Sequence, residues 1–409
     1  MTASASPSRA SDARKLPERS ELGGKAYGAG KRVILYVDND AKTFLLYRTH
    51  LARAAMEAGF RVHVATPSSS WVHKLEDAGF QHHAVPITRK GINPVTELRC
   101  VLALHRLYQR LKPDIIHHLR VKPTLYGGIA ARYCGVEAQV NMLTGLGYVF
   151  TSADLEALCL RPLVRAGLRL AFGSSNQRVV FENPENRDYL VSAGVVPEKR
   201  TRLVPGSGVN ASEFRPTPAP GGVPLCAMPC RMLWDKGVGE FVAAARILRN
   251  RGIQVRMALI GDTDPGNPSA VPVAQLREWR DSGVIEWWGY RPDMPAVIGE
   301  CSFVCLPTSY AEGVPTVLME AAAAGRAIVA SDSPGCREVV RHGQNGLRVP
   351  IHQPGLLADA IQLLATNPEL CAKFGNKSRA IAVADFSWEH VISLTLEIYS
   401  ELLRPRLAG

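Results

Sequence analysis

The sequence lacks long apolar runs, and its cysteines form no metal-binding pattern. No stretch is apolar for about eighteen residues, so we expect no transmembrane helix, and the start of the chain lacks the apolar core of a signal peptide. The nine cysteines are scattered; the closely spaced pairs Cys226/Cys230 and Cys301/Cys305 fall in strand-like runs without partner histidines. Zinc is therefore not expected, and buried reduced thiols indicate a cytoplasmic protein.

Two further absences exclude classes of ligand. No Gly-x-Gly-x-x-Gly follows the first predicted strand, which counts against a nicotinamide enzyme. The net charge of +11 and pI near 9.3 favour anionic partners, but no basic stripe is interleaved with aromatic residues. Nucleic acid is therefore the weakest of these partners, and nucleotide phosphates or acidic lipid headgroups are better ones. Hydrophobic content of 46% and charged content of 21% are ordinary for a globular protein.

The length and the pattern of elements predict two α/β domains. A chain of 409 residues suits two domains of about 150–200 residues each. Strands and helices alternate, which predicts parallel sheets; the predicted boundaries are 31–214 for the first domain, a Pro/Gly-rich linker at 215–224, a second domain at 225–385 and a terminal helix at 386–409.

Residues 1–30 are rich in small and basic side chains and show no periodicity, which is typical of a disordered tail. Up to Arg32 the chain has seven Lys/Arg and three Asp/Glu, and so carries +4 of the net charge. This basic tail either contacts anionic lipid or is merely solvated.

The most informative stretch reads as a β-loop-α-β unit. Cys301–Pro307 has the length and composition of a buried strand, Val314–Ala324 of a helix, and Ile328–Ala330 of a second strand. Pro315 suits the first helical turn and Gly325 the position just past the helix end. In such units ligands bind beyond the carboxyl ends of the strands, where the helix N-terminus suits a phosphate.

Two carboxylates mark this unit. Glu312 lies in the Gly/Pro turn, and Glu320 is the only charge on the alanine-rich helix. Burying an unpaired carboxylate is costly, and polyol hydroxyls would supply donors to it. A solvated helix edge would explain Glu320 alone, but with Glu312 and the Gly-Val-Pro turn we favour a sugar- or ribose-binding site.

Basic residues lie at two other strand ends. Arg231 and Lys236 stand between the strand Leu225–Pro229 and the helix Val238–Asn250, where two cations and free N–H groups suit a diphosphate. The alternative is a set of surface charges at a helix start.

His117 and Lys122 follow another strand, where protonatable groups serve acid–base chemistry or hold a phosphate. A structural role is equally compatible with both. Gly145 and Gly147 would let the backbone approach the cleft, unless they only form a tight turn.

Two patterns have competing interpretations. Asp38-Asn39-Asp40 imitates an Asp-x-Asp metal motif, but nothing nearby completes a metal shell, so we favour a cleft-facing turn that includes Asn39. Arg161, Arg165 and Arg169 share one face of the helix predicted at 155–172. We favour a packed helix with a solvated arginine edge; the alternative is a basic helix that faces a membrane.

The motifs together resemble a known enzyme family. Glu312-Gly-Val-Pro, Glu320-Ala, Gly325, Ser333-Pro-Gly-Cys-Arg-Glu-Val-Val and Gly343-Gln-Asn-Gly occur in the order seen in retaining glycosyltransferase family 4. The resemblance implies the GT-B fold, in which two Rossmann-like domains face each other across a cleft. It also implies that the second domain binds the nucleotide-sugar donor and the first the acceptor.

By the same resemblance, Glu312 contacts the donor sugar and Glu320 the ribose, while Arg231 and Lys236 hold the diphosphate in place of a metal. The implied donor site also contains Gly313, Val314, Pro315, Thr316, Gly289, Tyr290 and Arg291, the last three bordering the base. The chain departs from the family pattern before Arg231, which follows Met-Pro-Cys, and at Asn210, where Asp is frequent.

A second resemblance concerns the acceptor. His117…Lys122-Pro-Thr-Leu-Tyr-Gly-Gly and Thr144-Gly-Leu-Gly-Tyr148-Val-Phe are similar to a bacterial branch that builds surface glycans on polyprenyl-diphosphate lipids. This implies transfer of a hexose or N-acetylhexosamine from a UDP-sugar to a lipid-linked acceptor, at the inner face of the cytoplasmic membrane and without a cofactor. The alternatives are a sugar-nucleotide epimerase of the same fold and a non-catalytic nucleotide-sugar-binding subunit.

Overall fold

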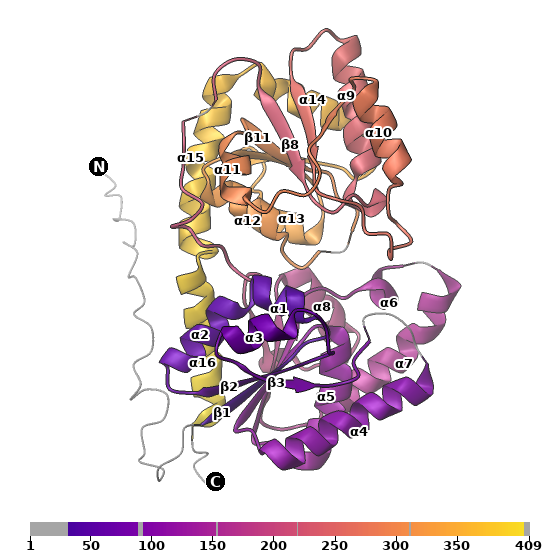
Figure 1. The fold of residues 1–409 in the computed structure, drawn as a ribbon, viewed down its shortest axis with the longest axis vertical. Coiled ribbons are helices and arrows are strands. Elements are labelled where there is room, and N and C mark those ends of the chain that lie inside the picture. The colour runs from indigo at the N-terminus through magenta and orange to yellow at the C-terminus, as the bar shows by residue number, and fades with distance from the viewer. Residues whose placement is uncertain (1–31, 89–92, 153, 219, 311, 405–409) are drawn as a thin grey trace, which may run out of the picture.

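The computed structural model describes residues 32–88, 93–152, 154–218, 220–310 and 312–404. The predicted basic tail at 1–30 lies outside the described residues. Two α/β domains stand one above the other (Figure 1).

The first domain is built on a parallel sheet of seven strands in the order β3-β2-β1-β4-β5-β6-β7. The strands are β1 (Val33–Val37), β2 (Arg61–Thr66), β3 (Gln81–Ala84), β4 (Ile115–Leu119), β5 (Ala138–Leu143), β6 (Gln177–Phe181) and β7 (Thr201–Leu203). The central strands β1, β4 and β5 are buried along their whole length, as expected for a parallel sheet with helices on both faces. The predicted parallel α/β organisation is confirmed.

The helices of this domain are α1 (Ala41–Tyr47), α2 (Thr49–Glu57), α3 (Val72–Asp77), α4 (Pro94–Leu111), α5 (Val121–Cys134), α6 (Tyr148–Thr151), α7 (Leu155–Ala171) and α8 (Pro184–Ser192). The sequence of residues 44–57 predicts one helix, but the structure has two, α1 and α2, in this part of the chain. Arg48 separates α1 from α2 with φ −132° and ψ −5°, and its side chain is buried against Glu182. A tertiary ion pair thus interrupts a segment whose local pattern favours a single helix.

The second domain has six parallel strands in the order β10-β9-β8-β11-β12-β13. The strands are β8 (Leu225–Pro229), β9 (Arg256–Ile260), β10 (Glu286–Trp287), β11 (Phe303–Leu306), β12 (Ala327–Ser331) and β13 (Gly346–Val349). The helices are α9 (Val238–Asn250), α10 (Val273–Asp281), α11 (Met294–Gly299), α12 (Thr316–Ala323), α13 (Pro334–Val339), α14 (Pro354–Ala365) and α15 (Pro368–Asp385).

The predicted β-loop-α-β unit is present as β11, α12 and β12. Pro315 precedes the first turn of α12 as its N-cap. Gly325 follows the helix with φ +69°, a conformation that glycine adopts at little cost.

The last helix, α16 (Trp388–Leu403), returns to the first domain. It packs against α2, β5 and β6, and Figure 1 shows α15 and α16 running along one side of both domains. The Tyr399 hydroxyl lies 3.1 Å from the Tyr36 hydroxyl and 2.6 Å from His117 Nδ1. The last helix therefore belongs to the core of the first domain.

No helix in the described part of the chain is long and apolar enough to cross a membrane.

Candidate active site

A pocket of about 130 Å³ lies where the carboxyl ends of the two sheets meet. The first domain contributes the residue after each of four strands, namely Asp38, Arg120, Thr144 and Glu182, together with Thr43, Tyr47, Arg48, Leu119 and Ser207. The second domain contributes Glu312, Gly313, Val314 and Thr316. Ligands of open α/β sheets bind at this edge, so this is the candidate active site.

Glu312 and Lys236 form an ion pair at the pocket. Their side chains are only 15% and 13% exposed, and Lys236 Nζ also lies 5.0 Å from the centre of the Tyr310 ring. Burial disfavours the ammonium, but the Glu312 carboxylate outweighs it, so the pKa of Lys236 is raised. Lys236 therefore stays charged at neutral pH and can act as a fixed cation beside the pocket.

Lys236 ends a short 3₁₀ turn (Trp234–Lys236) before Gly237. Gly237 has φ +83°, and a Cβ built there would lie 2.2 Å from the Pro307 carbonyl oxygen. Only glycine fits this turn, which places Lys236 against the end of β11. Arg231 is more exposed and pairs with Asp264 at 2.8 Å.

Glu320 has no hydrogen-bond or ion-pair partner among the residues that the structure describes. It is half-buried on α12. Burial, with a smaller contribution from Glu213, raises the pKa of Glu320 to about 7. The carboxylate also raises the pKa of Tyr47 across the cleft, an effect second to the burial of that phenol. Glu320 thus has acceptor capacity that hydroxyl groups of a ligand can fill.

The first domain holds one peptide group of the Glu312 loop from both sides. Asn183 Nδ2 donates to the Gly313 carbonyl at 3.0 Å, and the Val314 N–H donates to Glu182 Oε2 at 3.1 Å. These two groups belong to one peptide unit, the one that joins Gly313 to Val314. We call this arrangement the peptide clamp.

The peptide clamp is buried and charged. Glu182 Oε1 accepts from Arg48 Nη2 at 3.1 Å, and both side chains are at most 6% exposed. Burial raises the pKa of Glu182, although Arg48 and the Val314 N–H favour its charged form. A Cβ on Gly313 would lie 2.0 Å from Glu182 Oε2 and 2.4 Å from the Thr144 carbonyl oxygen. The domains can therefore meet in this way only with glycine at 313.

Arg120 has an unusual backbone. It precedes α5 with φ +77° and ψ 173°, a conformation that costs a residue with a Cβ about 1–3 kcal/mol. Its Nε lies 3.2 Å from Asp38 Oδ1. Asp38 is buried, which raises its pKa against the opposing effects of Arg120 and the Asn39 N–H. The strained turn thus carries a cation into the pocket.

None of the residues predicted for the site in the first domain lines the pocket, namely Asn39, His117, Lys122, Gly145, Gly147 and Tyr148. His117 is 1% exposed and bonded to Tyr399; burial, with Arg48 and His118 nearby, holds the pKa of His117 well below its usual range. Lys122 Nζ donates to Glu97 at 2.8 Å and to Thr88 at 3.1 Å. Asn39 is half-buried beside the pocket. The burial of His117 gives it a structural contact rather than a place against the donor.

The predicted glycine turns stand at the carboxyl ends of their strands. Gly145 and Gly147 have φ +146° and +70°, and Gly147 leads into α6. Tyr148 is 49% exposed, and its hydroxyl donates to Asp154 at 3.0 Å. These residues follow β5, next to Thr144 of the pocket.

In the second domain Gly289 has φ +68°, and its carbonyl accepts from the Gly261 N–H at 2.7 Å. Tyr290 is 64% exposed. Arg291 forms two hydrogen bonds with Asp293, at 2.8 and 2.6 Å. The turn at 289–291 therefore has an exposed aromatic ring beside the ends of β9 and β10. Pro315 is buried next to Val314.

Three charged residues of the first domain were not predicted, namely Arg48, Arg120 and Glu182, whereas Asp38 lies in the predicted cleft-facing turn. Arg120 and Glu182, like Asp38, are each the first residue after a strand, and this position is the signal that was available. Arg48 had no such signal, because it lies inside a helical pattern.

No group of three or more His, Cys, Asp or Glu side chains suited to a metal occurs within the described ranges. In the Asp-x-Asp imitation, Asp38 pairs with Arg120. Asp40 caps α1 by accepting from the Thr43 N–H at 3.2 Å. Both aspartates thus have partners within the protein.

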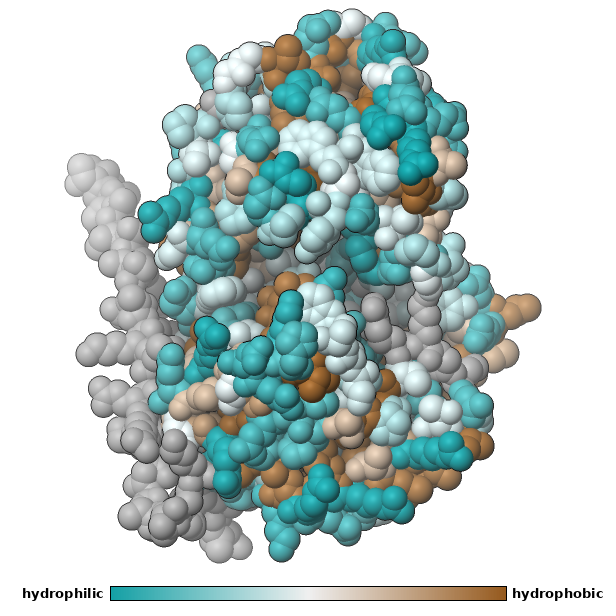
Figure 2. Space-filling view, in the orientation of Figure 1, coloured by the Kyte–Doolittle hydropathy of each residue, from teal (hydrophilic) through white to brown (hydrophobic). Residues whose placement is uncertain are grey.

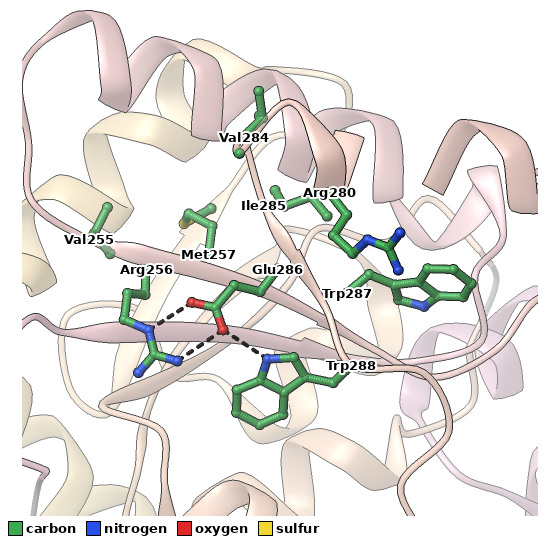
Figure 3. A pocket seen from close by; sticks show the side chains of 10 residues that line it. Val255, Arg256, Met257, Arg280, Val284, Ile285, Glu286, Trp287 and Trp288 are labelled. Carbon is green, nitrogen blue, oxygen red and sulfur yellow. Dashed lines mark hydrogen bonds and ion pairs between the residues drawn. The ribbon is translucent and has the colours of Figure 1, made fainter. Parts of the chain in front are cut away.

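A larger pocket, of about 480 Å³, lies at the outer edge of the second sheet (Figure 3). It begins at Val255, at the amino end of β9. The Glu286 carboxylate is already hydrogen-bonded within the protein: it accepts from Arg256 at 2.7 and 2.9 Å and from Trp288 Nε1 at 2.9 Å. This pocket is lined by residues of the second domain alone, and none of the predicted site residues lines it, so its size does not make it the candidate site.

Comparisons with known proteins agree with this geometry. Residues 224–367 match the family of glycosyl transferases group 1, and residues 33–175 match the glycosyl transferase 4-like family. An alpha-maltose-1-phosphate synthase from Mycolicibacterium smegmatis is 32% identical over 315 residues, which cover 68% of this chain and 78% of that protein. The chain is a group 1 glycosyltransferase.

This glycosyltransferase is also similar to a lipid-glycan enzyme. The N,N'-diacetylbacillosaminyl-diphospho-undecaprenol alpha-1,3-N-acetylgalactosaminyltransferase of Campylobacter jejuni is 25% identical over 371 residues, covering 88% of this chain and 96% of that protein. Among solved structures, Anabaena HepE in complex with UDP and glucose superposes with a TM-score of 0.71 at 19% identity, covering 91% of this chain and 99% of that one. The predicted GT-B fold and membership of the retaining family 4 are thereby confirmed.

Proposed function

We propose that this glycosyltransferase moves a sugar from a UDP-sugar to a lipid-linked acceptor at the cytoplasmic face of a membrane. The observation that carries the proposal is the buried Glu312–Lys236 pair at the pocket between the domains. It places an acceptor for sugar hydroxyls beside a cation for a diphosphate.

Donor binding would separate this pair. The diphosphate attracts Lys236 and Arg231, while the sugar hydroxyls donate to the Glu312 carboxylate in place of the ammonium. Glu320, which has no partner among the described side chains, accepts from the ribose hydroxyls. The base lies by the turn at 289–291, with Tyr290 exposed beside it.

The transfer step breaks the bond between the anomeric carbon and the diphosphate oxygen, which keeps the electron pair. Lys236 and Arg231 stabilise the negative charge that builds on this oxygen, an electrostatic role that needs no metal. The acceptor hydroxyl attacks on the face from which the diphosphate leaves, as in a retaining enzyme, and its proton passes to the leaving phosphate. Glu312 orients the sugar and does not take the proton.

The acceptor is proposed to bind the first domain. The relative from Campylobacter jejuni acts, by its name, on a diphospho-undecaprenol glycan, and the UDP in the HepE complex supports a uridine nucleotide here. Arg120 lies in the pocket opposite Glu312 and suits an anionic or polyhydroxyl acceptor.

UDP release from a panel of UDP-sugars tests the proposal. We expect release that depends on polyprenyl-diphosphate glycan or membrane extract and that Glu312→Gln reduces by about 100-fold or more, the loss typical of a positioning contact. Glu57→Gln, which changes an exposed carboxylate on α2, is the matched control. Tight UDP binding without turnover on any donor would contradict the proposal.

A further inference from the structure

The exposed face of α7 is mostly apolar, with Glu156 and Arg169 as its exposed charged residues. Leu155 is 81% exposed and Leu163 69%, and Leu158 and Leu170 are 44% and 39% exposed. Cys159, Pro162 and Ala166 fill the exposed positions between them. A monomeric protein rarely presents such a continuous apolar stripe to water.

The arginines of α7 bind inside the domain instead. Arg161 donates to the carbonyls of Val149 and Ser152 at 2.9 and 2.7 Å. Arg165 donates to the Tyr189 hydroxyl at 2.6 Å. Arg169 is exposed but donates to the carbonyls at positions 194 and 193 at 2.9 and 2.7 Å. The expectation of an outward arginine edge, solvated or membrane-facing, is therefore wrong for Arg161 and Arg165, because their guanidinium groups satisfy loop carbonyls and a tyrosine.

The helix α4, which packs against the same helix α5 as α7 does, has a second exposed apolar stripe. Val95, Leu98 and Leu102 are 58%, 60% and 45% exposed, and their spacing puts them on one face of the helix. Arg106 and Arg110 continue the same face toward the helix end. Figure 2 shows brown side chains beside teal ones along the lower part of the first domain, where Figure 1 places α4.

The apolar and basic parts are arranged by the topology. In a parallel sheet the connecting helices run opposite to the strands, so α4 and α7 both begin at the edge that faces the cleft. The exposed leucines of α4, with Leu155, Leu158 and Leu163 of α7, lie in the first half of their helices, up to the midpoint, and Arg106 and Arg110 lie in the second half of α4. The helix α5 lies between α4 and α7, and α6, with the exposed Tyr148, packs against α7.

We propose that this surface docks on an anionic lipid bilayer. It is defined by Val95, Leu98, Leu102, Leu155, Leu158 and Leu163, with Arg106 and Arg110 as its basic part; we call it the α4–α7 face. The leucines enter the boundary between headgroups and acyl chains, and the arginines contact anionic headgroups. The inference rests on the proposed function, since a lipid-borne acceptor would then reach the pocket along α6.

Vesicle co-sedimentation of the full chain tests the docking. We expect binding to vesicles of equal parts phosphatidylcholine and phosphatidylglycerol, and much weaker binding to phosphatidylcholine alone. The variant L155S/L158S/L163S should bind about tenfold less or worse, which corresponds to about 1.4 kcal/mol. Removing Arg106 and Arg110 by glutamine should cost about fivefold per residue, from the usual attraction of one cation to an anionic leaflet.

The matched control is L356S/L363S. It removes two leucines of α14 that are 46% and 44% exposed in the second domain, and it should bind vesicles like the wild type. Calorimetric UDP binding, measured on every variant, reports on the donor site separately. Unchanged UDP binding with lost vesicle binding supports the docking.

Three results would overturn the inference while leaving the transferase proposal intact, provided that UDP still binds and turns over. They are equal binding to both vesicle types, full binding by the three-serine variant, and a change from dimer to monomer in that variant without any loss on vesicles. Failure to bind UDP would count against the proposed function instead.

Discussion

The substitution Gly313→Ala tests whether the peptide clamp sets the position of Glu312. A methyl group at 313 would meet Glu182 Oε2 at 2.0 Å and the Thr144 carbonyl oxygen at 2.4 Å. The carbonyl belongs to a backbone that follows β5 and cannot move aside, so the loop must leave the first domain. The fold of each domain should survive, because the clash lies between the domains.

The size of the effect follows from the two hydrogen bonds that are lost. The bond to the Glu182 carboxylate contributes about 1.5–3 kcal/mol and the neutral bond to Asn183 about 1 kcal/mol. Their loss disfavours the joined state by about 2.5–4 kcal/mol. At about 1.4 kcal/mol per tenfold change, kcat should fall by about 60- to 700-fold. UDP affinity should change little, since Lys236 and Glu320 lie outside the clamp.

Initial rates of UDP release, calorimetric UDP binding and thermal unfolding together measure this outcome. Gly355→Ala is the matched control, because a Cβ at 355 meets no atom within 4 Å. A Gly313→Ala enzyme with the wild-type kcat would refute the reasoning. So would a parallel loss of UDP affinity and thermal stability, which would indicate damage to the second domain itself.

Three further predictions concern stability. Burial raises the pKa of Glu320 to about 7, so the folded state binds this proton more tightly than the unfolded state and loses stability as pH rises from about 5 to 7. Urea unfolding of Glu320→Gln should show a smaller decline over this pH range. An unchanged pH profile in the variant would contradict the prediction. Arg48→Met alone leaves the buried Glu182 unpaired and should cost about 3–5 kcal/mol, and adding Glu182→Gln should restore part of this; strict additivity would show no coupling. Tyr399→Phe leaves the hydrogen-bonding groups of Tyr36 and His117 without their buried partner and should lower the free energy of unfolding by about 2–4 kcal/mol while kcat is retained. A loss of kcat without a loss of stability would indicate that His117 takes part in catalysis.

The sequence was sufficient for the sheets but not for the part of the pocket that the first domain contributes. Strands such as Leu225–Pro229 are predicted to the residue, because a buried parallel strand is a short apolar run between turns. The loop around Glu312 could be recognised from the sequence because its motif occupies a few consecutive residues. The first domain contributes single residues from four strand ends, and only the tertiary structure shows that they meet.

His117 and the α7 arginines show why the remaining predictions failed to reach the site. A residue inside a strand points to a face of the sheet, so His117 points toward α16, while Arg120, just past the strand, reaches the cleft. Helical spacing places Arg161 and Arg165 on one face, but it does not say which face is outward. Long guanidinium side chains can satisfy distant carbonyls, as Arg161 does.

The return of α16 has a consequence for how the protein is made. Tyr36 and Tyr399 are 363 positions apart in the sequence, and their hydroxyl groups form a hydrogen bond in the core of the first domain. During synthesis on the ribosome the first domain must wait for almost the whole chain, while the second can fold as soon as its own strands emerge. The order of folding would then be the reverse of the order of synthesis. A ribosome-bound chain that ends before Trp388 should protect the second domain from protease and leave the first one open to cleavage.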